Sequence, residues 1–299
     1  MSIIGRLIEN RLHSLADFDA QLDLAFTGIP TASGVSVSEE SSLENTAVWN
    51  AITLLSQTLA EVPLKLFERL SPRGKREARD NTLFNILHIA PNPEMTSFNW
   101  RETQMAALLS WGNAYSEIQF DRQTGRIIAL WPIPPNRVKV KRIAGQLFYD
   151  ILLPTGVTVT LPAFRMLHFP GFSLDGIVGL SPIALHRNAI ALGLATEEYG
   201  SRFFGNGAVP GGVLMHKETL STNAQERLRK AWSETQAGLS NAQRVAILEE
   251  GMEYKQIGIP PEDAQFLATR QFQVVEIARI YNVPPSMIQD LSRATFSIV

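Results

Sequence analysis

Apolar residues recur at helical spacing near the start of the patterned part of the chain. They lie three or four residues apart, which predicts a helix with one apolar face formed by Val48, Ile52, Leu55 and Leu59. Pro63 ends this pattern, and a strand is expected at residues 64–69, followed by a charged loop at 71–80. The serine-rich stretch before residue 45 has no such pattern, so residues 1–44 are expected to form a flexible arm.

Shorter helices and then strands are expected next. Residues 81–88 form a helix candidate, and Thr96 or Ser97 can cap another helix that runs to about residue 110. From residue 114 to residue 169 the pattern becomes strand-like, with alternating apolar residues at 147–153. Turns within this region are expected at Gly125, Gly145 and Gly156.

Two long helices are expected in the second half of the chain. Ser181 followed by Pro182 is a helix start, and this helix would run to about Phe204. One of its faces carries a stripe of Leu185, Ala189, Leu192, Thr196, Tyr199 and Phe203. The second helix would begin at Pro260-Pro261 and end near Tyr281, and residues 208–259 between the two have the pattern of a small α/β unit. The pattern therefore predicts an α+β fold with an insertion between paired helices.

Composition narrows the classes of function. The chain has 299 residues, with 27 basic and 29 acidic side chains and a net charge of −2. A protein that grips DNA through its phosphates normally carries a basic surplus, so a nucleic acid partner would be held loosely or by geometry. The absence of cysteine excludes disulfides and thiolate metal sites. No apolar run reaches the roughly 20 residues that span a bilayer, and cytoplasmic synthesis without a secretory signal is expected.

Enzyme motifs are weak. No lysine-serine pair follows the glycine-rich run at 205–211, as a phosphate loop would require, and no two histidines have the i, i+4 spacing of a helical metal site. The best catalytic constellation is His168, Ser173 and Asp175, but the second glycine of the nucleophile elbow falls one residue late at Gly176. A serine hydrolase using Ser173 and His168 is therefore the weaker alternative to an ordinary loop. We expect no catalytic activity, no cofactor and no metal.

Several short motifs occur in a fixed order: Val48-Trp49-Asn50-Ala51-Ile52, Pro91-Asn92-Pro93, Leu109-Ser110-Trp111-Gly112-Asn113-Ala114-Tyr115, Gly179-Leu180-Ser181-Pro182, Phe203-Phe204-Gly205-Asn206-Gly207-Ala208, Glu262-Asp263-Ala264-Gln265-Phe266-Leu267 and Val283-Pro284-Pro285-Ser286-Met287-Ile288. Together they resemble the portal proteins of long-tailed double-stranded DNA phages. Each motif alone is modest, whereas their joint occurrence in this order is specific. The resemblance extends from about residue 45 to residue 297.

The resemblance implies a portal-like division of the chain. The expected parts are a flexible arm at 1–44, a wing domain at 45–180, a first stem helix at 181–207, a clip domain at 208–259, a second stem helix at 260–282 and the start of a channel loop at 283–299. It further implies a structural subunit of a dodecameric ring at the capsid vertex of the virion, assembled in the host cytoplasm. The implied protein partners are the terminase large subunit, a head–tail adaptor and the major capsid protein. Double-stranded DNA is expected to pass through the channel without sequence-specific contacts, and no membrane partner is implied.

The resemblance also suggests site residues. The candidates for lining the DNA channel are Gln289, Arg293 and Thr295, although Arg293 is as compatible with a solvent-facing arginine. The charged residues of the stem are Glu197, Glu198, Arg202, Arg270, Glu276 and Arg279. Ion pairs, between subunits or in solvent, are the favoured interpretation for these charges over DNA contacts.

The C-terminus departs from the family, whose members continue into a long kinked helix and a crown. The loss of that helix would expose apolar surface, which is expected around Ile277, Ile280, Tyr281 and Ile288. A chain of this length is expected to be monomeric or aggregation-prone. A truncated prophage remnant without ring-forming activity is therefore the alternative function, and a monomeric interaction module derived from a decayed phage is a third.

Overall fold

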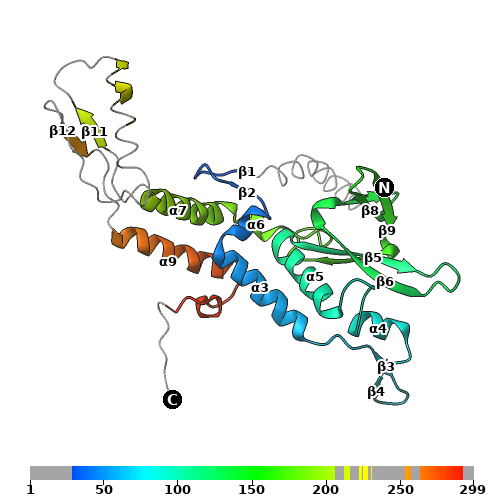
Figure 1. Ribbon diagram of the computed structural model, residues 1–299. Coiled ribbons are helices and arrows are strands. Elements are labelled where there is room, and N and C mark those ends of the chain that lie inside the picture. Colours follow the sequence, from blue (N-terminus) through cyan, green and yellow to red (C-terminus); the bar gives the residue numbers. More distant parts are fainter. Residues whose placement is uncertain are drawn as a thin grey trace, which may run out of the picture. The chain divides into compact units, whose positions relative to one another are not determined.

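The computed structural model describes residues 29–205, 212–215, 222–223, 225–227, 230, 253–256 and 263–291. Its elements mix helices and strands, so the predicted α+β fold class is confirmed (Figure 1). The chain divides into two compact units. Unit 1 comprises Met1–Ala191 and Val275–Val299, and unit 2 comprises Leu192–Val274.

The serine-rich segment at residues 29–44 has defined structure, where the sequence predicted a flexible arm. β1 (Ile29–Pro30) pairs with β2 (Ser36–Val37), and a short 3-10 helix, η1 (Ser41–Glu44), follows. The Oγ atoms of Ser38 and Ser41 each accept a hydrogen bond from the other residue's backbone N–H, at 3.0 and 2.9 Å respectively. The serine hydroxyls therefore cap the local backbone, a role that composition alone does not distinguish from disorder.

The first long helix, α3 (Thr46–Glu61), lies where the sequence predicted it. The Asn45 side chain caps it by accepting hydrogen bonds from two backbone N–H groups of the first turn, at 3.1 and 3.3 Å. Its buried residues are Ala47, Val48, Ala51, Ile52, Ser56 and Ala60. Leu59 was expected on this face but is 47% exposed, because the last turn points Ala60 inward instead.

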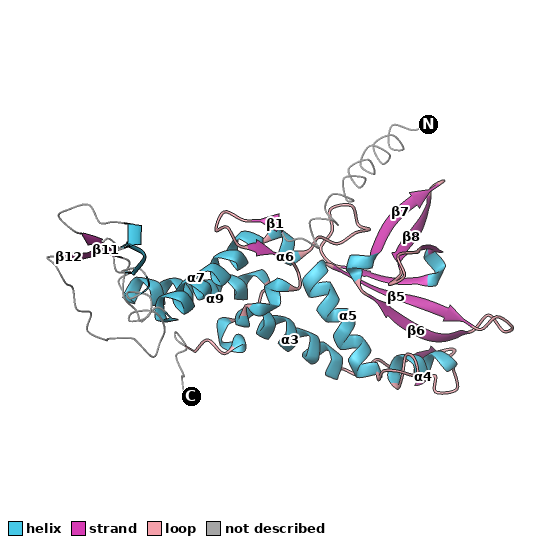
Figure 2. Cartoon of the chain, turned by 45° about the horizontal axis from the view of Figure 1, so that its top comes forward, coloured by secondary structure: helices cyan, strands magenta, loops and turns pink. Residues whose placement is uncertain are grey.

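Two further helices confirm the sequence expectation. α4 (Thr82–His88) is capped by Asn81, and α5 (Ser97–Trp111) is capped by Thr96. Figure 2 shows α3 and α5 side by side, and α5 also contacts the strand that follows it. Arg101 of α5 donates from Nη2 and Nε to the Ala60 carbonyl oxygen, at 2.7 and 3.2 Å, so it satisfies a carbonyl at the end of α3.

Two three-stranded antiparallel sheets form the strand-rich middle of unit 1, with orders β10-β5-β6 and β7-β8-β9. Their strands are β5 (Asn113–Phe120), β6 (Ile127–Ile133), β7 (Val138–Ile143), β8 (Gln146–Leu152), β9 (Thr158–Pro162) and β10 (Met166–Pro170). The 3-10 turns η2 (Pro135–Arg137) and η3 (Ala163–Arg165) connect the two sheets. Turns occur at Gly125, Gly145 and Gly156, as predicted, and each of these glycines has a positive φ.

The core of unit 1 includes two clusters of buried side chains among the described residues. One joins the two sheets and contains Tyr115, Val138, Tyr149, Ile151, Leu161 and Met166. The other lies between α4, α5 and β6 and contains Ile86, Trp100 and Leu130. Burying each of the large side chains contributes about 1.5–3 kcal/mol relative to leaving it exposed. Trp100 donates from Nε1 to Ser116 Oγ at 3.0 Å, so its polar atom is satisfied within the core.

One strand of this region falls within the strand predicted at 64–69, and a second falls within the segment 71–80 that was predicted as a charged loop. β3 (Phe67–Arg69) and β4 (Lys75–Glu77) form an antiparallel hairpin. All three β3 residues are exposed, so this hairpin has no buried face to produce an apolar alternation in the sequence.

The predicted helix from residue 181 to about 204 is interrupted. Ser181 caps α6 (Pro182–Leu185), as expected, but His186 leaves the helical conformation with φ −107° and ψ 19° before α7 (Arg187–Gly205) begins. The buried side chains of unit 1 in these helices are Ile183, Ile190 and Ala191. The predicted apolar stripe is exposed at its large residues, which are Leu185, Leu192 and Tyr199. The side of the helix that carries smaller side chains is the one that is buried.

In unit 2, α7 packs closely against α9 (Asp263–Ile280). A Cβ on Gly200 would lie 2.9 Å from the Phe266 ring, and the Tyr199 and Phe266 ring centroids are 6.1 Å apart. β11 (Gly212–Met215) pairs with β12 (Glu253–Gln256), near two of the predicted strands. Most of the remaining residues of the α/β unit predicted at 208–259 lie outside the described residues.

The end of α9 and the short helix η5 (Pro285–Ile288) are covered within unit 1, contrary to the expectation of exposed apolar surface there. Ile277, Tyr281 and Ile288 are buried, and Ile280 is half-buried. η5 contacts α3, and Asn50 of α3 donates from Nδ2 to the Ile288 carbonyl oxygen at 3.2 Å. The expectation failed because it did not place α3 over this surface. None of the helices in the described ranges is long and apolar enough to span a membrane.

Candidate functional site

Residues 171–181, which connect β10 to α6, form a segment that we call the junction loop. Gly112, the left-handed C-cap of α5 with φ 73°, accepts a hydrogen bond from Gly171 N–H at 2.7 Å. A Cβ on Gly112 would lie 2.1 Å from the Leu180 carbonyl oxygen, and a Cβ on Gly179 would lie 1.9 Å from the Gly112 carbonyl oxygen. Glycine is required at both positions because the two backbones touch.

Asn113, the first residue of β5, holds the junction loop through its side-chain amide. Its Oδ1 accepts from Gly179 N–H at 2.8 Å, and its Nδ2 donates to the Gly179 carbonyl oxygen at 2.7 Å. Asn113 is buried, so it replaces the water that would otherwise satisfy both backbone groups. Asn113 belongs to one of the family motifs, but this role was not predicted from the sequence. The available signal was an amide directly after a helix-ending glycine.

His168 of β10 lies beside this network. Its Nε2 is 3.0 Å from Asn113 Oδ1, an acceptor, and its Nδ1 is 3.3 Å from the Tyr149 hydroxyl. These partners assign a neutral imidazole that carries its proton on Nε2. The ring stacks on Tyr115 with centroids 4.4 Å apart. Burial lowers the pKa of His168 to about 4, against a smaller opposing effect of the Asp175 carboxylate.

The structure does not assemble Ser173 and His168 into a catalytic pair. Ser173 Oγ lies 2.7 Å from both Asp175 Oδ1 and the Val178 carbonyl oxygen, and it accepts from Gly176 N–H at 3.0 Å. Asp175 Oδ1 in turn accepts from two backbone N–H groups. Both ring nitrogens of His168 are engaged by other residues. Ser173 and Asp175 therefore form a hydrogen-bonded turn, which was the favoured interpretation of this segment.

Glu39 joins the N-terminal segment to the start of α6. Its Oε1 lies 2.9 Å from Ser181 Oγ, which also lies 2.8 Å from the Ser110 carbonyl oxygen. Burial raises the pKa of Glu39, and the hydrogen bond with Ser181 opposes that shift in part. The sequence analysis missed this residue because it stands in a serine-rich run. A carboxylate in a stretch poor in apolar residues gives no signal of burial.

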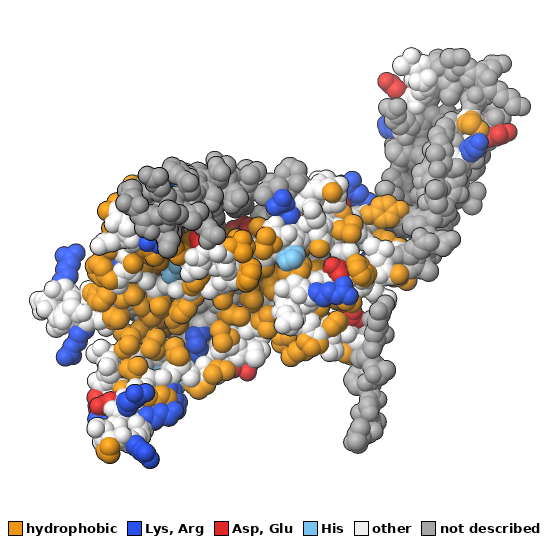
Figure 3. All heavy atoms as spheres, turned by 180° about the vertical axis from the view of Figure 1, so that it is seen from behind, with side chains coloured by type: hydrophobic (Ala, Val, Ile, Leu, Met, Phe, Trp, Pro, Cys, Tyr) orange, Lys and Arg blue, Asp and Glu red, His pale blue; other side chains and the backbone are white. Residues whose placement is uncertain are grey.

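The tip of the junction loop carries exposed apolar side chains. Phe172 and Leu174 are each 75% exposed, although the polar contacts of Ser173 and Asp175 fix the backbone between and beside them. Figure 3 shows that hydrophobic side chains also cover a broad area of one face of the molecule. Large apolar groups held rigidly in solvent are typical of surfaces that contact another macromolecule.

The charged residues of the predicted stem lie on exposed or half-buried parts of α7 and α9. Glu198 pairs with Arg202 within α7, and Glu276 pairs with Arg279 within α9. No ionic partner is found among the described residues for Glu197 or Arg270. Exposed pairs within one helix stabilise it by about 0.5 kcal/mol or less. These contacts fit solvated ion pairs, and the roles of the six residues stay predictions.

Of the predicted channel residues, the structure describes only Gln289. It is exposed, has a left-handed backbone with φ 68° and ends η5, where its N–H donates to the Ser286 carbonyl oxygen at 3.3 Å. Arg293 and Thr295 lie outside the described residues. The assignment of these three residues to a DNA channel therefore stays a prediction.

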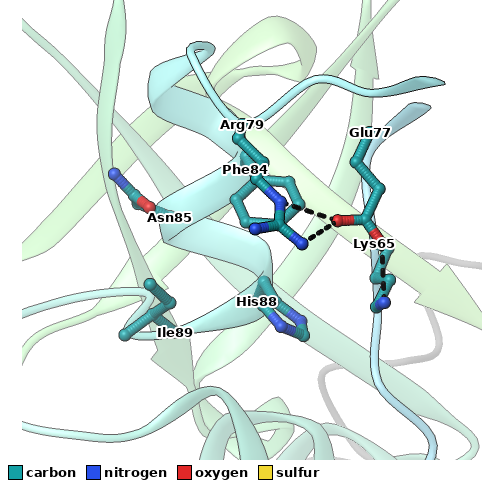
Figure 4. A pocket seen from close by; sticks show the side chains of 7 residues that line it. All are labelled: Lys65, Glu77, Arg79, Phe84, Asn85, His88 and Ile89. Carbon is teal, nitrogen blue, oxygen red and sulfur yellow. Dashed lines mark hydrogen bonds and ion pairs between the residues drawn. The ribbon is translucent and has the colours of Figure 1, made fainter. Parts of the chain in front are cut away.

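A charged hollow lies where the β3–β4 hairpin meets α4 (Figure 4). Glu77 is placed between two cations, with its Oε1 2.7 Å from Lys65 Nζ and its Oε2 2.7 Å from an Arg79 nitrogen. Hydrogen bonds from Lys65 and then Arg79 lower the pKa of Glu77 to about 2. From the sequence this segment was predicted only to be a charged loop. No cluster of His, Asp and Glu suited to a metal ion is found in the part of the chain that the structure describes.

The fold matches solved structures of one class of viral protein. A crystal structure of an HK97-family phage portal protein from Corynebacterium diphtheriae superposes with a TM-score of 0.61 at 17% identity, covering 90% of this chain and 82% of that one. A chain in the neck of a native gene transfer agent particle, computed with C12 symmetry, superposes with a TM-score of 0.56 at 23% identity, covering 85% and 71%. The fold is therefore that of a portal protein.

The sequence comparison gives the family directly. The family model for phage portal proteins matches residues 46–299. The probable portal protein of Streptomyces phage phiC31 is 36% identical over 282 residues, which cover 90% of this chain and 60% of the relative. The chain belongs to the phage portal protein family. It spans about 60% of the length of the curated portal relatives that it matches.

Proposed function

We propose that this chain is the structural subunit of a portal ring at the capsid vertex, and that the ring forms the channel for DNA packaging and ejection. The observation that carries the proposal is the match of most of the chain to a subunit in a particle neck with C12 symmetry. In this role the ring docks the terminase large subunit and the head–tail adaptor, sits within the major capsid protein shell and acts without catalysis. Its location is the portal vertex of the virion, after assembly in the host cytoplasm.

The surface of the described residues supports association between copies. Phe172 and Leu174 are the most exposed of the large apolar side chains, each at 75%. Isolated soluble proteins rarely leave large contiguous apolar areas in water. A closed ring uses two different faces of each subunit, so apolar groups on one face are covered by a complementary face of the next subunit.

The proposal assigns a role to each part of the chain. Residues 45–180 are the wing, the helices at 181–207 and 260–282 are the stem, 208–259 are the clip, and 283–299 begin the channel loop. The interrupted helix at His186 divides the first stem segment without changing this order. A net charge of −2 suits a channel through which DNA must slide, because many phosphate contacts would retard it.

Electron microscopy and sedimentation velocity test ring formation. The purified chain is compared with a version extended by a family member's C-terminal segment, each over a range of concentrations. Closed rings with a central opening in at least one of the two are expected. Monomers throughout, in both versions, would contradict the proposal and favour a remnant without ring-forming activity.

A matched pair of substitutions tests whether the junction loop takes part in assembly. Phe172→Ser should shift the ring-forming version towards monomers, because it removes an exposed apolar group from a rigid loop. Phe164→Ser is the control, since it removes a similarly exposed ring from η3, outside that loop. If the Phe172 variant and the unmodified chain assemble equally, the junction loop does not take part in the interface between subunits.

A further inference from the structure

The β3–β4 hairpin with its flanking residues is a basic segment that is exposed along most of its length. Residues 65–79 contain six cationic side chains and two carboxylates, a surplus of four positive charges in a chain whose net charge is −2. The cations are Lys65, Arg69, Arg73, Lys75, Arg76 and Arg79. Because the rest of the chain is acidic overall, attraction of a polyanion to this molecule would be local to such a segment.

Three cations of the hairpin segment take no part in its ion pairs. Glu77 is shared by Lys65 and Arg79, and Glu68 pairs with Arg76. Both carboxylates of the segment are therefore already occupied. Among the described residues, no carboxylate pairs with the remaining cations Arg69, Arg73 and Lys75.

Two of these unpaired cations lie directly opposite each other. Arg69 and Lys75 are cross-strand partners in the hairpin register. Backbone bonds from Ala78 N–H to Leu66 and from Leu70 N–H to Gly74 bracket the ladder, which makes Arg69–Lys75 a non-hydrogen-bonded pair. Side chains of such a pair are the closest in an antiparallel ladder, and like charges there destabilise it. A bound anion would relieve that repulsion.

The same face is shaped as a shallow hollow. Phe67, Arg69, Gly74 and Lys75 line a space of about 460 Å³ that is open to solvent. Lys75 Nζ lies 4.6 Å from the centre of the Phe67 ring, which holds the ammonium group on this face. The cations are therefore presented together beside the hairpin turn, on a ribbon that is exposed along its length.

We propose that this hairpin binds the phosphate backbone of duplex DNA without reading its sequence. A two-stranded ribbon is a shape that fits against a DNA groove, and arginine and lysine are the usual phosphate ligands. The contact is proposed with the backbone, because arginine and lysine bind phosphate groups whatever the base sequence. This contact involves none of the proposed channel residues and does not require ring formation.

The test measures binding of the full chain to a labelled mixed-sequence duplex by fluorescence anisotropy between about 50 and 200 mM salt. The triple variant Arg69→Gln, Arg73→Gln, Lys75→Gln is expected to bind at least tenfold more weakly, with a salt slope smaller by about 3. The control Arg122→Gln, Arg126→Gln, Arg137→Gln removes three exposed cations elsewhere in unit 1 and should change affinity less than threefold. The triple variant should unfold at the same temperature or higher, because repulsion is removed.

Three results would overturn the proposal. The first is no binding of the duplex by the unmodified chain at the lowest salt. The second is an equal loss in both triple variants, which would spread the attraction over the whole surface. The third is tighter binding of poly-glutamate than of DNA, lost in the hairpin variant, which would make an acidic polypeptide the partner. Sedimentation of the same samples reports ring formation separately, so failure of the ring proposal and failure of this one are distinguishable.

Discussion

The junction loop and the β3–β4 hairpin are both polar, yet they are stabilised in different ways. In the junction loop a buried amide and close backbone contacts fix one geometry, through Asn113, Gly112 and Gly179. In the hairpin, exposed ion pairs hold two short strands that have no buried face. Buried hydrogen bonds are costly to break, because the groups they leave have no water, whereas exposed ion pairs exchange with solvent. Substitutions should therefore affect stability far more in the junction loop.

The largest effect is expected for Gly179→Ala. The added Cβ would lie 1.9 Å from the Gly112 carbonyl oxygen, a contact with backbone that no side-chain rotation can relieve. The free energy of unfolding should fall by about 3–5 kcal/mol or the chain should fail to fold, as measured by urea denaturation. Gly176→Ala is the matched control in the same loop. It has φ 76° but open space around its Cβ position, so it should cost only about 1 kcal/mol.

Asn113→Ala should have the next largest effect. It leaves the N–H and carbonyl groups of Gly179 without partners in a buried position. The expected loss is about 2–3 kcal/mol, again by urea denaturation. Asn113→Asp distinguishes the two bonds, since a carboxylate accepts from Gly179 N–H but cannot donate to its carbonyl. If the free energy of unfolding falls by less than about 0.5 kcal/mol in Asn113→Ala, water reaches the loop, and the junction loop is not stabilised differently from the exposed hairpin.

The two regions should also differ in their pH dependence. The folded-state pKa of His168, about 4, is below its ordinary value of 6.5, so the folded protein binds fewer protons between these values. The stability that His168 contributes is therefore present above pH 6.5 and declines as the pH falls towards 4. His168→Gln should flatten this part of the curve of urea midpoint against pH. If the urea midpoint of the variant depends on pH as strongly as that of the unmodified chain, other groups cause the pH dependence.

Glu77 and Glu39 affect the stability of the fold in different pH ranges. The lowered pKa of Glu77 gives a contribution that is present above its ordinary value of 4.5 and is lost as the pH falls towards about 2. Glu39 has a raised pKa, so its contribution is present at low pH and is lost as the pH rises through its folded-state value. The contributions of His168 and Glu39 to the slope of stability against pH have opposite signs. Measuring the urea midpoint against pH for His168→Gln and for Glu39→Gln therefore separates the two contributions.

Sequence patterns predicted the elements that have a strong local signal. Thr96 and Ser181 cap helices as expected, and the turn glycines fall where expected, because caps and turns depend on neighbouring residues alone. The order of helical and strand patterns predicted the α+β fold class, and the family motifs predicted that the fold is that of a portal protein. The break at His186 and the burial of Ile288 under α3 depend on packing between distant segments, which periodicity does not report.

The candidate site was predicted less well than the fold. Ser173 and Asp175 were correctly interpreted as a turn, since an aspartate before glycine is a local turn signal. The contacts of Glu39 with Ser181 and of Asn113 with Gly179 span 142 and 66 residues, and a single sequence gives no indication of such pairs. The hairpin charges were visible in the sequence, but their cross-strand register was not, because an exposed ribbon has no apolar face that would set it.

The smallest effect is expected for the ion pair of the hairpin, in which Arg76 Nε lies 2.9 Å from Glu68 Oε2 and both side chains are more than half exposed. A double-mutant cycle of Glu68→Gln and Arg76→Gln should give a coupling of about 0.5 kcal/mol or less, which disappears near 1 M salt because exposed charges are screened there. A coupling above about 1 kcal/mol that persists in salt would mean that the pair is structurally buried and that the hairpin is stabilised like the junction loop. A weak, salt-sensitive coupling would instead show that these charges remain accessible to solvent ions, and the unpaired cations on the other face of the same ribbon would be equally open to phosphate.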